Sequence, residues 1–171
     1  MKKLSLLLAF LLAGPLLLAG CNATSDAQRF EQVISGILAV SKADLPVLSP
    51  ADQAIVQPWV TLGTTLDSQL EACITGASAA GGKKAAFLSC FNTFSAGLLN
   101  PQELAQLKVI SPASQSKVQV WVTAIALGIN AALPLFGGNP QPMPVMSSYQ
   151  PTHQDLSIIA RRVNLNPTWG Y

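Results

Sequence analysis

The sequence predicts an all-α fold, a four-helix array built from two tandem helical hairpins. The first reason is an internal repeat, because 49–61 and 111–123 are identical at nine of their thirteen positions at an offset of 62. The second is that apolar residues in each copy recur three and four positions apart, which is the period of an amphipathic helix. The third is a Ser-Pro pair at the same place in each copy, a combination that favours a helix start. One hairpin alone could not bury its apolar stripe, so the two copies are expected to pack together.

The first twenty residues have the pattern of a secretory signal peptide. Lys2 and Lys3 are followed by a short apolar run and then by small residues. Such a segment is too short and wrongly flanked to be a membrane-spanning helix. We therefore expect 1–20 to be a signal peptide that is absent from the mature protein.

The signal ends in the four residues Leu18-Ala19-Gly20-Cys21. This motif resembles the lipobox of bacterial lipoproteins. The resemblance implies that Cys21 is acylated and anchors the protein to membrane lipid in the bacterial cell envelope, with 21–27 as anchor and tether. Under the sorting rule of enteric bacteria, Asn22 favours the outer membrane, on its periplasmic face. The alternative is an ordinary secreted protein whose cleavage site adjoins a cysteine.

The charge balance argues against nucleic-acid binding. The chain has ten basic and eight acidic side chains, and two of the lysines leave with the signal, so the mature protein is neutral. A neutral, sparsely charged domain has no basic surface for nucleic acid and nothing to steer acidic substrates. Its length and apolar content predict one single-core helical domain over 28–136.

The first repeat is predicted over about 28–77. Its first helix should run from about Asp26 to Ser41, and Ser49 and Pro50 should begin its second, with the serine side chain as the cap. Pro58 lies nine residues into that second helix, so we expect either a kink or a separate short helix over 50–57. The apolar stripe of the first helix is Phe30, Val33, Ile34, Ile37 and Leu38.

The second helix of this repeat has a clear buried line and a polar face. The predicted buried residues are Ile55, Trp59, Leu62, Leu66, Leu70 and Cys73. Asp67, Ser68 and Glu71 fall on the other side, where we expect them to face solvent.

Two cysteines flank the glycine-rich loop predicted over 76–82. Cys73 lies eight residues before Gly81, and Cys90 lies eight residues after Gly82. If the chain reverses at the glycine pair, the two thiols lie at the same height on antiparallel helices, within reach of a disulfide. The envelope is an oxidising compartment, which favours the bond. A redox or metal pair is the alternative, but the cysteines lack close spacing and a nearby histidine.

The second repeat is predicted over about 84–136. Its first helix should cover about 83–99, with a turn of helix at 102–108, and Ser111 should cap the last helix as its counterpart does in the first copy. The stripe of the first of these helices is Phe87, Phe91, Phe94 and Leu98. The last helix is apolar on nearly every side over 118–136, so we expect it to be the most buried helix of the array.

The segment 137–171 is predicted to be a proline-rich linker followed by a short C-terminal helix. Thr152 and Asp155 are predicted to cap the start of a helix that ends near Val163. We expect this tail to fold back across the bundle, because a three-turn helix is marginal without a surface to pack on. The alternative is a tethered recognition segment, in which 152–171 binds a membrane surface or an envelope protein.

No catalytic, cofactor or metal site is predicted. His153 is the one histidine of the chain, and no nucleophile motif or phosphate loop is present. Trp59 and Trp121 occupy matched positions and are predicted to be core anchors, with ligand stacking as the alternative. Gln57 and Gln119, also matched, are predicted to form paired hydrogen bonds between helices.

Two functions remain open on this sequence. The first is a lipid-anchored envelope protein, not an enzyme, with a structural or protein-interaction role. The second is a membrane-active protein of the pore-forming or lysis type, which would insert the apolar helix 118–136, since nineteen such residues are long enough to span a bilayer.

Overall fold

The computed structural model describes residues 22–145 and 150–163, and every regular element in these ranges is helical. The predicted signal peptide over 1–20, Cys21, residues 146–149 and the last eight residues lie outside them. The α-helices are α2 (Ala23–Asp44), α3 (Pro50–Ala79), α4 (Lys84–Leu98), α5 (Pro101–Gln106), α6 (Pro112–Ala132) and α7 (His153–Arg162). Three short 3-10 helices lie between them, η2 (Leu45–Val47), η3 (Leu107–Val109) and η4 (Leu133–Phe136).

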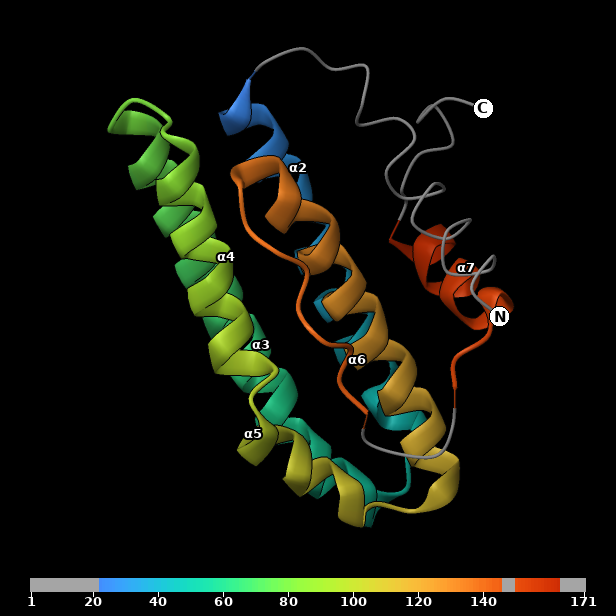
Figure 1. The fold of residues 1–171 in the computed structure, drawn as a ribbon. Helices are drawn as coiled ribbons and strands as arrows, with labels where there is room; N and C mark the ends of the chain where they lie inside the picture. The colour runs from blue at the N-terminus through green and yellow to red at the C-terminus, as the bar shows by residue number, and fades with distance from the viewer. Residues whose placement is uncertain (1–21, 146–149, 164–171) are drawn as a thin grey trace.

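The four long helices form an antiparallel bundle, which confirms the predicted all-α class (Figure 1). α2 packs against α3 and α6, and α3 packs in turn against α4. The core between them is apolar, and its largest fully buried side chains include the three phenylalanines predicted for the stripe of α4. Most of the predicted stripe of α2 is buried as well.

The internal repeat corresponds to matched structural environments at the ends of the helices. Leu45 and Leu107 are both buried in the 3-10 turns, whereas Val47 and Val109 are 62 % and 73 % exposed. These pairs are separated by the same offset of 62 as the sequence repeat. At these pairs, residues at matched positions of the repeat therefore share the same degree of burial, in the core and at the surface alike.

The first two helices are longer than predicted. α2 begins at Ala23, so 23–27 is helix and the predicted tether over 21–27 is wrong. α3 is one helix of 30 residues that continues through Pro58, so a separate helix over 50–57 is also wrong. Pro58 and Ala54 are both exposed, and water can therefore hydrate the Ala54 carbonyl that has lost its partner N–H.

α6 is the most buried long helix, as its composition predicted. Twelve of its 21 residues are buried, compared with seven of the 30 in α3. Among the described helices, Pro112–Phe136 has the length and hydropathy of a membrane span, and 67 % of its most apolar window is buried inside the bundle. The other helices cover most of the apolar surface of this segment, and a helix covered in this way is typical of the core of a bundle.

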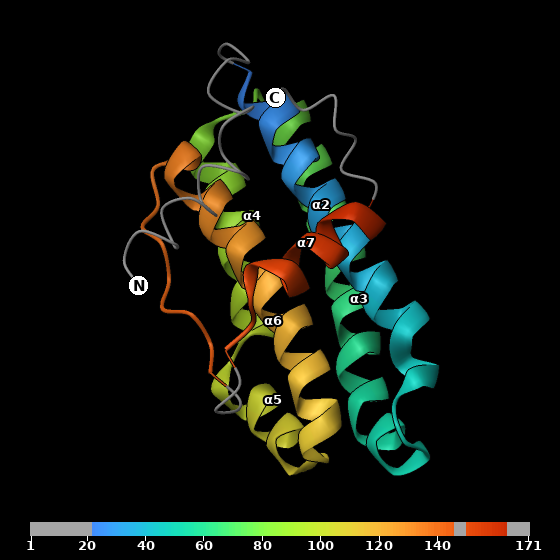
Figure 2. The ribbon, with the colours of Figure 1, turned by 90° about the vertical axis from the view of Figure 1, so that its right-hand side faces the viewer.

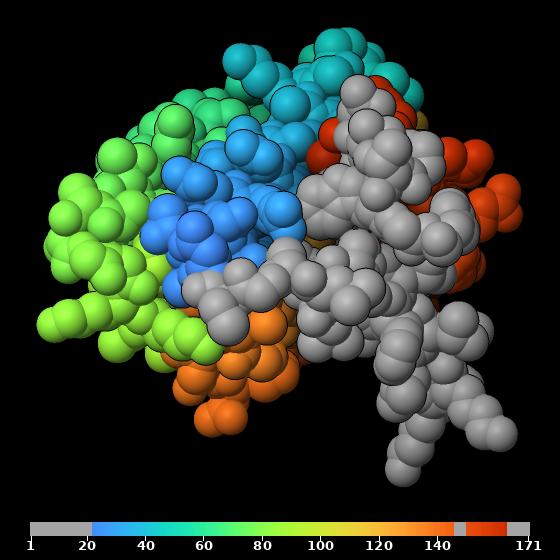
Figure 3. Space-filling model, turned by 90° about the horizontal axis from the view of Figure 1, so that it is seen from above, coloured from blue at the N-terminus to red at the C-terminus, as the bar shows by residue number. Residues whose placement is uncertain are grey.

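The turn between α3 and α4 is closed by the predicted disulfide. Cys73 and Cys90 are bonded, with their Cα atoms 5.8 Å apart, and the chain reverses at Gly81 and Gly82, which have φ values of 97° and 64°. Cys73 is exposed and so lies off the buried line on which it was predicted. Figure 3, the view onto this end, shows the turn beside the first residues of α2.

The C-terminal helix folds back across α2 and α6, as predicted (Figure 2). Thr152 and Asp155 form a complete capping box at its start. Ile159 is 5 % exposed, and the end of the helix is fixed by an ion pair between Arg162 and Asp44 of α2. α7 is therefore packed on the bundle, and the rest of the predicted recognition segment, 164–171, lies outside the described residues.

Candidate functional site

A groove between α4 and α6 is the most distinctive feature of the surface. In the first hairpin α2 packs along α3, but in the second α4 and α6 make little direct contact. The extended segment 138–145, which we call the strap, lies between them instead (Figure 1). The linker was predicted to lack regular structure, which is correct, but nothing in its sequence indicated that it docks between two helices. We call the surface beneath it the strap groove.

The chain enters the strap groove through η4. The ring of Phe136 stacks on Phe91 and lies against Phe87, with centroid separations of 5.5 and 5.6 Å. Both partners belong to α4, so η4 carries the chain from the end of α6 onto α4. Gly137 then turns the chain with a φ of 87°, a conformation that glycine adopts without strain. The strap is thereby directed back along the two helices.

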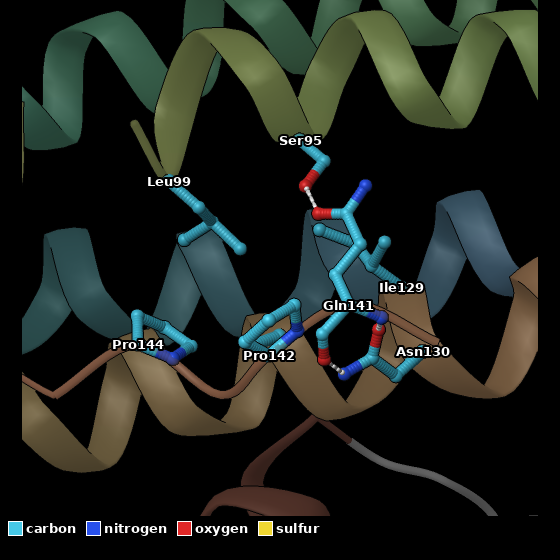
Figure 4. Close-up of a pocket in the computed structure, with 8 residues that line it drawn as sticks. Ser95, Leu99, Ile129, Asn130, Gln141, Pro142 and Pro144 are labelled. Carbon is cyan, nitrogen blue, oxygen red and sulfur yellow. Dashed lines mark hydrogen bonds between the residues drawn. The ribbon is translucent and has the colours of Figure 1, made fainter. Parts of the chain in front are cut away.

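Asn130 of α6 holds the strap by its backbone. Its Nδ2 donates to the Gln141 carbonyl at 2.9 Å, and the Gln141 N–H donates to its Oδ1 at 2.7 Å. The Gln141 side chain points the other way, toward α4, where its Oε1 accepts a hydrogen bond from the Ser95 hydroxyl at 2.6 Å (Figure 4). One strap residue thus connects both walls of the groove.

A second amide of α6 contacts the strap further along. Gln119 donates to the Pro144 carbonyl at 3.1 Å and to Thr123 Oγ1 at 3.0 Å. Its repeat counterpart Gln57 is exposed and donates to Thr61 of its own helix. The predicted pairing of Gln57 with Gln119 is therefore wrong. The physical reason is that the first hairpin has no strap, so its glutamine faces solvent.

The strap does not fill the groove. A cavity of about 230 Å³ remains beneath it, lined by Ser95, Leu99, Ala126, Ile129, Asn130, Gln141, Pro142 and Pro144. Its floor is mainly apolar, and polar side chains stand at one side (Figure 4). Gln141 and Pro142 are themselves exposed, so the strap covers the groove without being buried in it.

The matched tryptophans lie in the core, as predicted. Trp59 and Trp121 are each 2 % exposed, and the indole N–H of Trp59 donates to the Leu98 carbonyl at 3.2 Å. Neither lines the cavity of the strap groove. The structure therefore gives no support to the alternative in which the indoles stack on a ligand.

The starts of α3 and α6 meet at one buried carboxylate, Asp52. It accepts hydrogen bonds from the hydroxyls of Ser49 (2.8 Å), Ser111 (2.6 Å) and Ser114 (2.7 Å), and from the backbone N–H of Ser111 (3.0 Å). These bonds, chiefly those from Ser111, hold the pKa of Asp52 well below its usual range. Ser114 is the repeat counterpart of Asp52, so matched residues of the two copies touch here.

This arrangement changes the cap predicted for α6. Ser49 caps α3 as expected, accepting from the Asp52 N–H at 3.2 Å, but the Ser111 side chain makes no cap bond to α6. The prediction for Ser111 is wrong because its hydroxyl donates to Asp52 of the other hairpin instead. Sequence signals for a cap describe only the local chain, and here a residue 59 positions away competes for the same hydroxyl.

The buried carboxylate leads to a prediction about its counterpart. Ser114→Asp would place a second carboxylate against Asp52, and two like charges in hydrogen-bond contact cannot both ionise without a large cost. We expect the melting temperature at pH 7 to fall by roughly 5 °C or more, with a smaller loss near pH 4, where one carboxyl takes up a proton. Ala113→Asp, at an exposed position in the same first turn, is the matched control and should change little. Equal melting temperatures for the two variants would contradict the geometry.

Three carboxylates meet on the face between α2 and α3, namely Glu31, Asp67 and Glu71, which we call the carboxylate cluster. Partial burial, with the charges of Asp67 and Glu71, raises the pKa of Glu31 to about 7. Burial also raises the pKa of Asp67, partly opposed by a hydrogen bond from Ser35. Asp67 was predicted to face solvent; that is wrong, because α2 covers it and leaves its Oδ1 buried without a hydrogen-bond partner.

The carboxylate cluster predicts a stability that falls as pH rises. The folded state binds the Glu31 proton more tightly than the unfolded state, so stability is lost between about 4.5, the ordinary pKa, and about 7. Glu31→Gln should therefore stabilise the protein at pH 8 by about 1 kcal/mol, a figure discounted for solvent screening, and should change little at pH 4. Urea unfolding at both values measures this. Glu71→Gln should act in the same direction but less, and an unchanged stability of Glu31→Gln at pH 8 would argue against the cluster.

The remaining polar residues do not assemble into a chemical site. Within 22–145 and 150–163, no group of three His, Cys, Asp or Glu side chains is arranged to hold a metal ion. His153 is exposed at the start of α7. Sequence reasoning missed Asn130, Ser95 and Gln141, because single polar residues in apolar helices or linkers give no signal of their own.

No family model, curated protein or solved structure matches this chain. The features of the chain that bear on its function are the motif Leu18-Ala19-Gly20-Cys21 and the strap groove.

Proposed function

We propose that this chain is a lipid-anchored protein of the bacterial cell envelope with a structural or protein-interaction role and no catalytic activity. The observation that carries the anchoring is the motif Leu18-Ala19-Gly20-Cys21 at the end of a signal-like segment. An acyl chain buries apolar methylene groups in the bilayer, and two or more chains anchor a protein stably. Under the sorting rule of enteric bacteria, Asn22 after the cysteine favours the periplasmic face of the outer membrane.

The disulfide and the neutral charge agree with this proposal. Disulfides persist in the oxidising compartments outside the cytoplasm, and the bond between Cys73 and Cys90 closes a short turn of the helical bundle. The mature chain would carry no net charge, which offers nothing to nucleic acid. The interaction role is supported by the strap groove, a cavity with an apolar floor and a few polar groups beside it.

The tail 152–171 is a second surface proposed to contact an envelope protein. The support is α7, on which Ile158 is 43 % exposed and Arg161 is exposed near it. An exposed apolar side chain close to a guanidinium group is typical of a small docking surface.

Lipidation predicts a defined mass and a defined location. The mature protein from bacterial membranes should begin at Cys21 and should be heavier than its polypeptide by a diacylglyceryl group and usually one further acyl chain. Cys21→Ser should abolish the addition and release the protein from the membrane fraction, while the fold persists. Intact-mass measurement and membrane fractionation test this. An unmodified mature chain with Cys21 as a free thiol would overturn the anchoring.

The membrane-active alternative is favoured by one observation. Pro112–Phe136 is long and apolar enough to cross a bilayer, although 67 % of its most apolar window is buried by the other helices. Insertion would require the bundle to open and expose that surface, which costs the burial energy of the core. The variant Ile125→Asp, at a fully buried position of α6, distinguishes the two functions.

A further inference from the structure

The strap groove has the properties of a peptide-binding site that the chain occupies with its own strap. Asn130 pairs with both the N–H and the C=O of Gln141, which is how an adjacent β-strand would hold a peptide. These two hydrogen bonds involve the peptide backbone and not the side chain, so any residue other than proline could form them at this position. A peptide of another protein could take the same bonds.

The composition of the strap favours an extended conformation that can bind in a groove. Prolines at 140, 142 and 144 alternate with other residues. Proline fixes φ and has no N–H, so the segment is extended before it binds and leaves few donors to satisfy. Preformed extended segments lose little entropy on docking, and recognition of proline-rich peptides in grooves depends on this property.

The groove needs an occupant. Ser95 and Gln119 are 2 % and 3 % exposed, and both donate hydrogen bonds to the strap. Removing the strap would leave the Ser95 hydroxyl facing an open groove, and an incoming peptide would supply the acceptors again. Gln119 and Asn130 bond to the strap backbone and Ser95 bonds to a strap side chain, so the walls of the groove present polar groups to an extended chain.

The strap nevertheless fits the groove incompletely. The cavity of about 230 Å³ beneath it is lined by apolar atoms of Leu99, Ala126 and Ile129. The strap residues that line it are Gln141, whose side chain reaches Ser95, and Pro142 and Pro144, whose rings are small and rigid. A leucine or aromatic side chain at either position would occupy volume that the strap leaves empty, and burying such a side chain favours binding.

We infer that the strap groove binds an extended, proline-containing segment of a partner protein, which displaces the strap and places a large apolar side chain in the cavity. The strap is then an intramolecular competitor that keeps the groove covered until the partner arrives. The inference rests on the proposed interaction role, of which it names the surface and the partner chemistry.

The test uses the full-length chain in detergent and three synthetic peptides with blocked ends. The first peptide has the native sequence of 138–145, and the second has the same sequence with Pro142→Leu. The third is the Pro142→Leu peptide with a methyl group on the Gln141 backbone nitrogen. The methyl group removes the N–H that donates a hydrogen bond to Asn130 Oδ1. The protein is used unaltered and as a released variant carrying Pro140→Gly, Gln141→Gly and Pro142→Gly, which loosens the strap and leaves both walls of the groove intact. Binding is measured by titration calorimetry.

The released variant should bind the Pro142→Leu peptide at least about tenfold more tightly than the peptide of native sequence, and the methylated peptide at least about tenfold more weakly than its unmethylated parent. Adding Asn130→Ala should cause a similar loss. The unaltered chain should bind every peptide more weakly than the released variant, because its own strap competes at high effective concentration.

Two results would overturn the inference. One is a released variant that keeps its helical circular dichroism and binds no peptide at 1 mM. The other is equal affinity for the native and Pro142→Leu peptides, which would make the cavity a gap in packing. If the released variant does not fold, Gln141→Ala takes its place in the same titration, since it removes the side-chain hydrogen bonds to Ser95 and Asn92 of α4 and keeps the backbone bonds to Asn130. Lipidation of Cys21 is measured separately by mass, so the anchoring and the groove can fail independently.

Discussion

Ile125→Asp is expected to unfold the bundle. Ile125 lies in the middle of α6 and is 0 % exposed, so the variant buries a carboxylate with no partner placed to receive it. The cost is on the order of several kcal/mol, which is a large part of the 5–15 kcal/mol that holds a typical domain together. Thermal unfolding of the chain carrying Cys21→Ser, followed by circular dichroism, measures the loss.

The same variant separates the two proposed functions. Ala113→Asp, exposed at the start of α6, introduces the same charge and should shift stability by less than about 0.5 kcal/mol. If Ile125→Asp leaves the melting temperature unchanged but abolishes binding to lipid vesicles, then α6 meets lipid and not the core. The membrane-active function would then replace the interaction role.

Removal of the disulfide is expected to have the second largest effect. The double variant Cys73→Ala, Cys90→Ala removes a cross-link between residues that are 17 positions apart in the sequence. On the chain-entropy model the unfolded state then gains conformational entropy, which lowers the free energy of unfolding by about 3 kcal/mol. Alanine at both positions avoids burying a new hydroxyl at Cys90, which is 2 % exposed. Urea unfolding of the double variant and of the native chain gives the difference.

Reductant supplies the control for this prediction. The native chain in dithiothreitol should lose about as much stability as the double variant, whose own stability should not respond to reductant. Alkylation of the unreduced protein from the envelope should label neither Cys73 nor Cys90. If both thiols are labelled before reduction, the disulfide is absent from the protein in the cell.

The fold was predictable because its information is local and repeated. The apolar period of each helix and the two Ser-Pro starts are contained in short windows, and the offset of 62 indicated that the windows belong to equivalent hairpins. The matched burial of Trp59 and Trp121 followed from the repeat alone. The disulfide followed from the glycine pair, since equal distances from one turn place two residues side by side.

The wrong predictions concern residues whose environment is decided by a distant segment. Ser111 was expected to cap its own helix, but Asp52 takes its hydroxyl. Asp67 was expected in solvent, but α2 lies over it. Pro58 was expected to interrupt α3, but the carbonyl that it leaves unpaired belongs to an exposed residue. Propensities and spacing describe the chain near a residue and contain nothing about such neighbours.

The strap groove could not be predicted for the same reason. A run of prolines indicates an extended segment, but its position depends on the space between α4 and α6, which exists only after the bundle has formed. Asn130 appeared in the sequence as a single polar residue in an apolar helix. Its role became visible only when the backbone of Gln141 was found beside it.

Asp52, the carboxylate at the start of α3 that binds Ser111 and Ser114, shows an advantage of having both hairpins in one polypeptide. A dimer of identical hairpins would place the same residue twice at the point where Asp52 meets Ser114. Two aspartates there would repel each other, and two serines would offer the Ser111 N–H and hydroxyl no anion to bind. Two copies joined in one chain can differ in sequence, and here they carry one aspartate and one serine at equivalent places. Fusion of the hairpins therefore permits an unlike pair at a contact that exact symmetry would forbid.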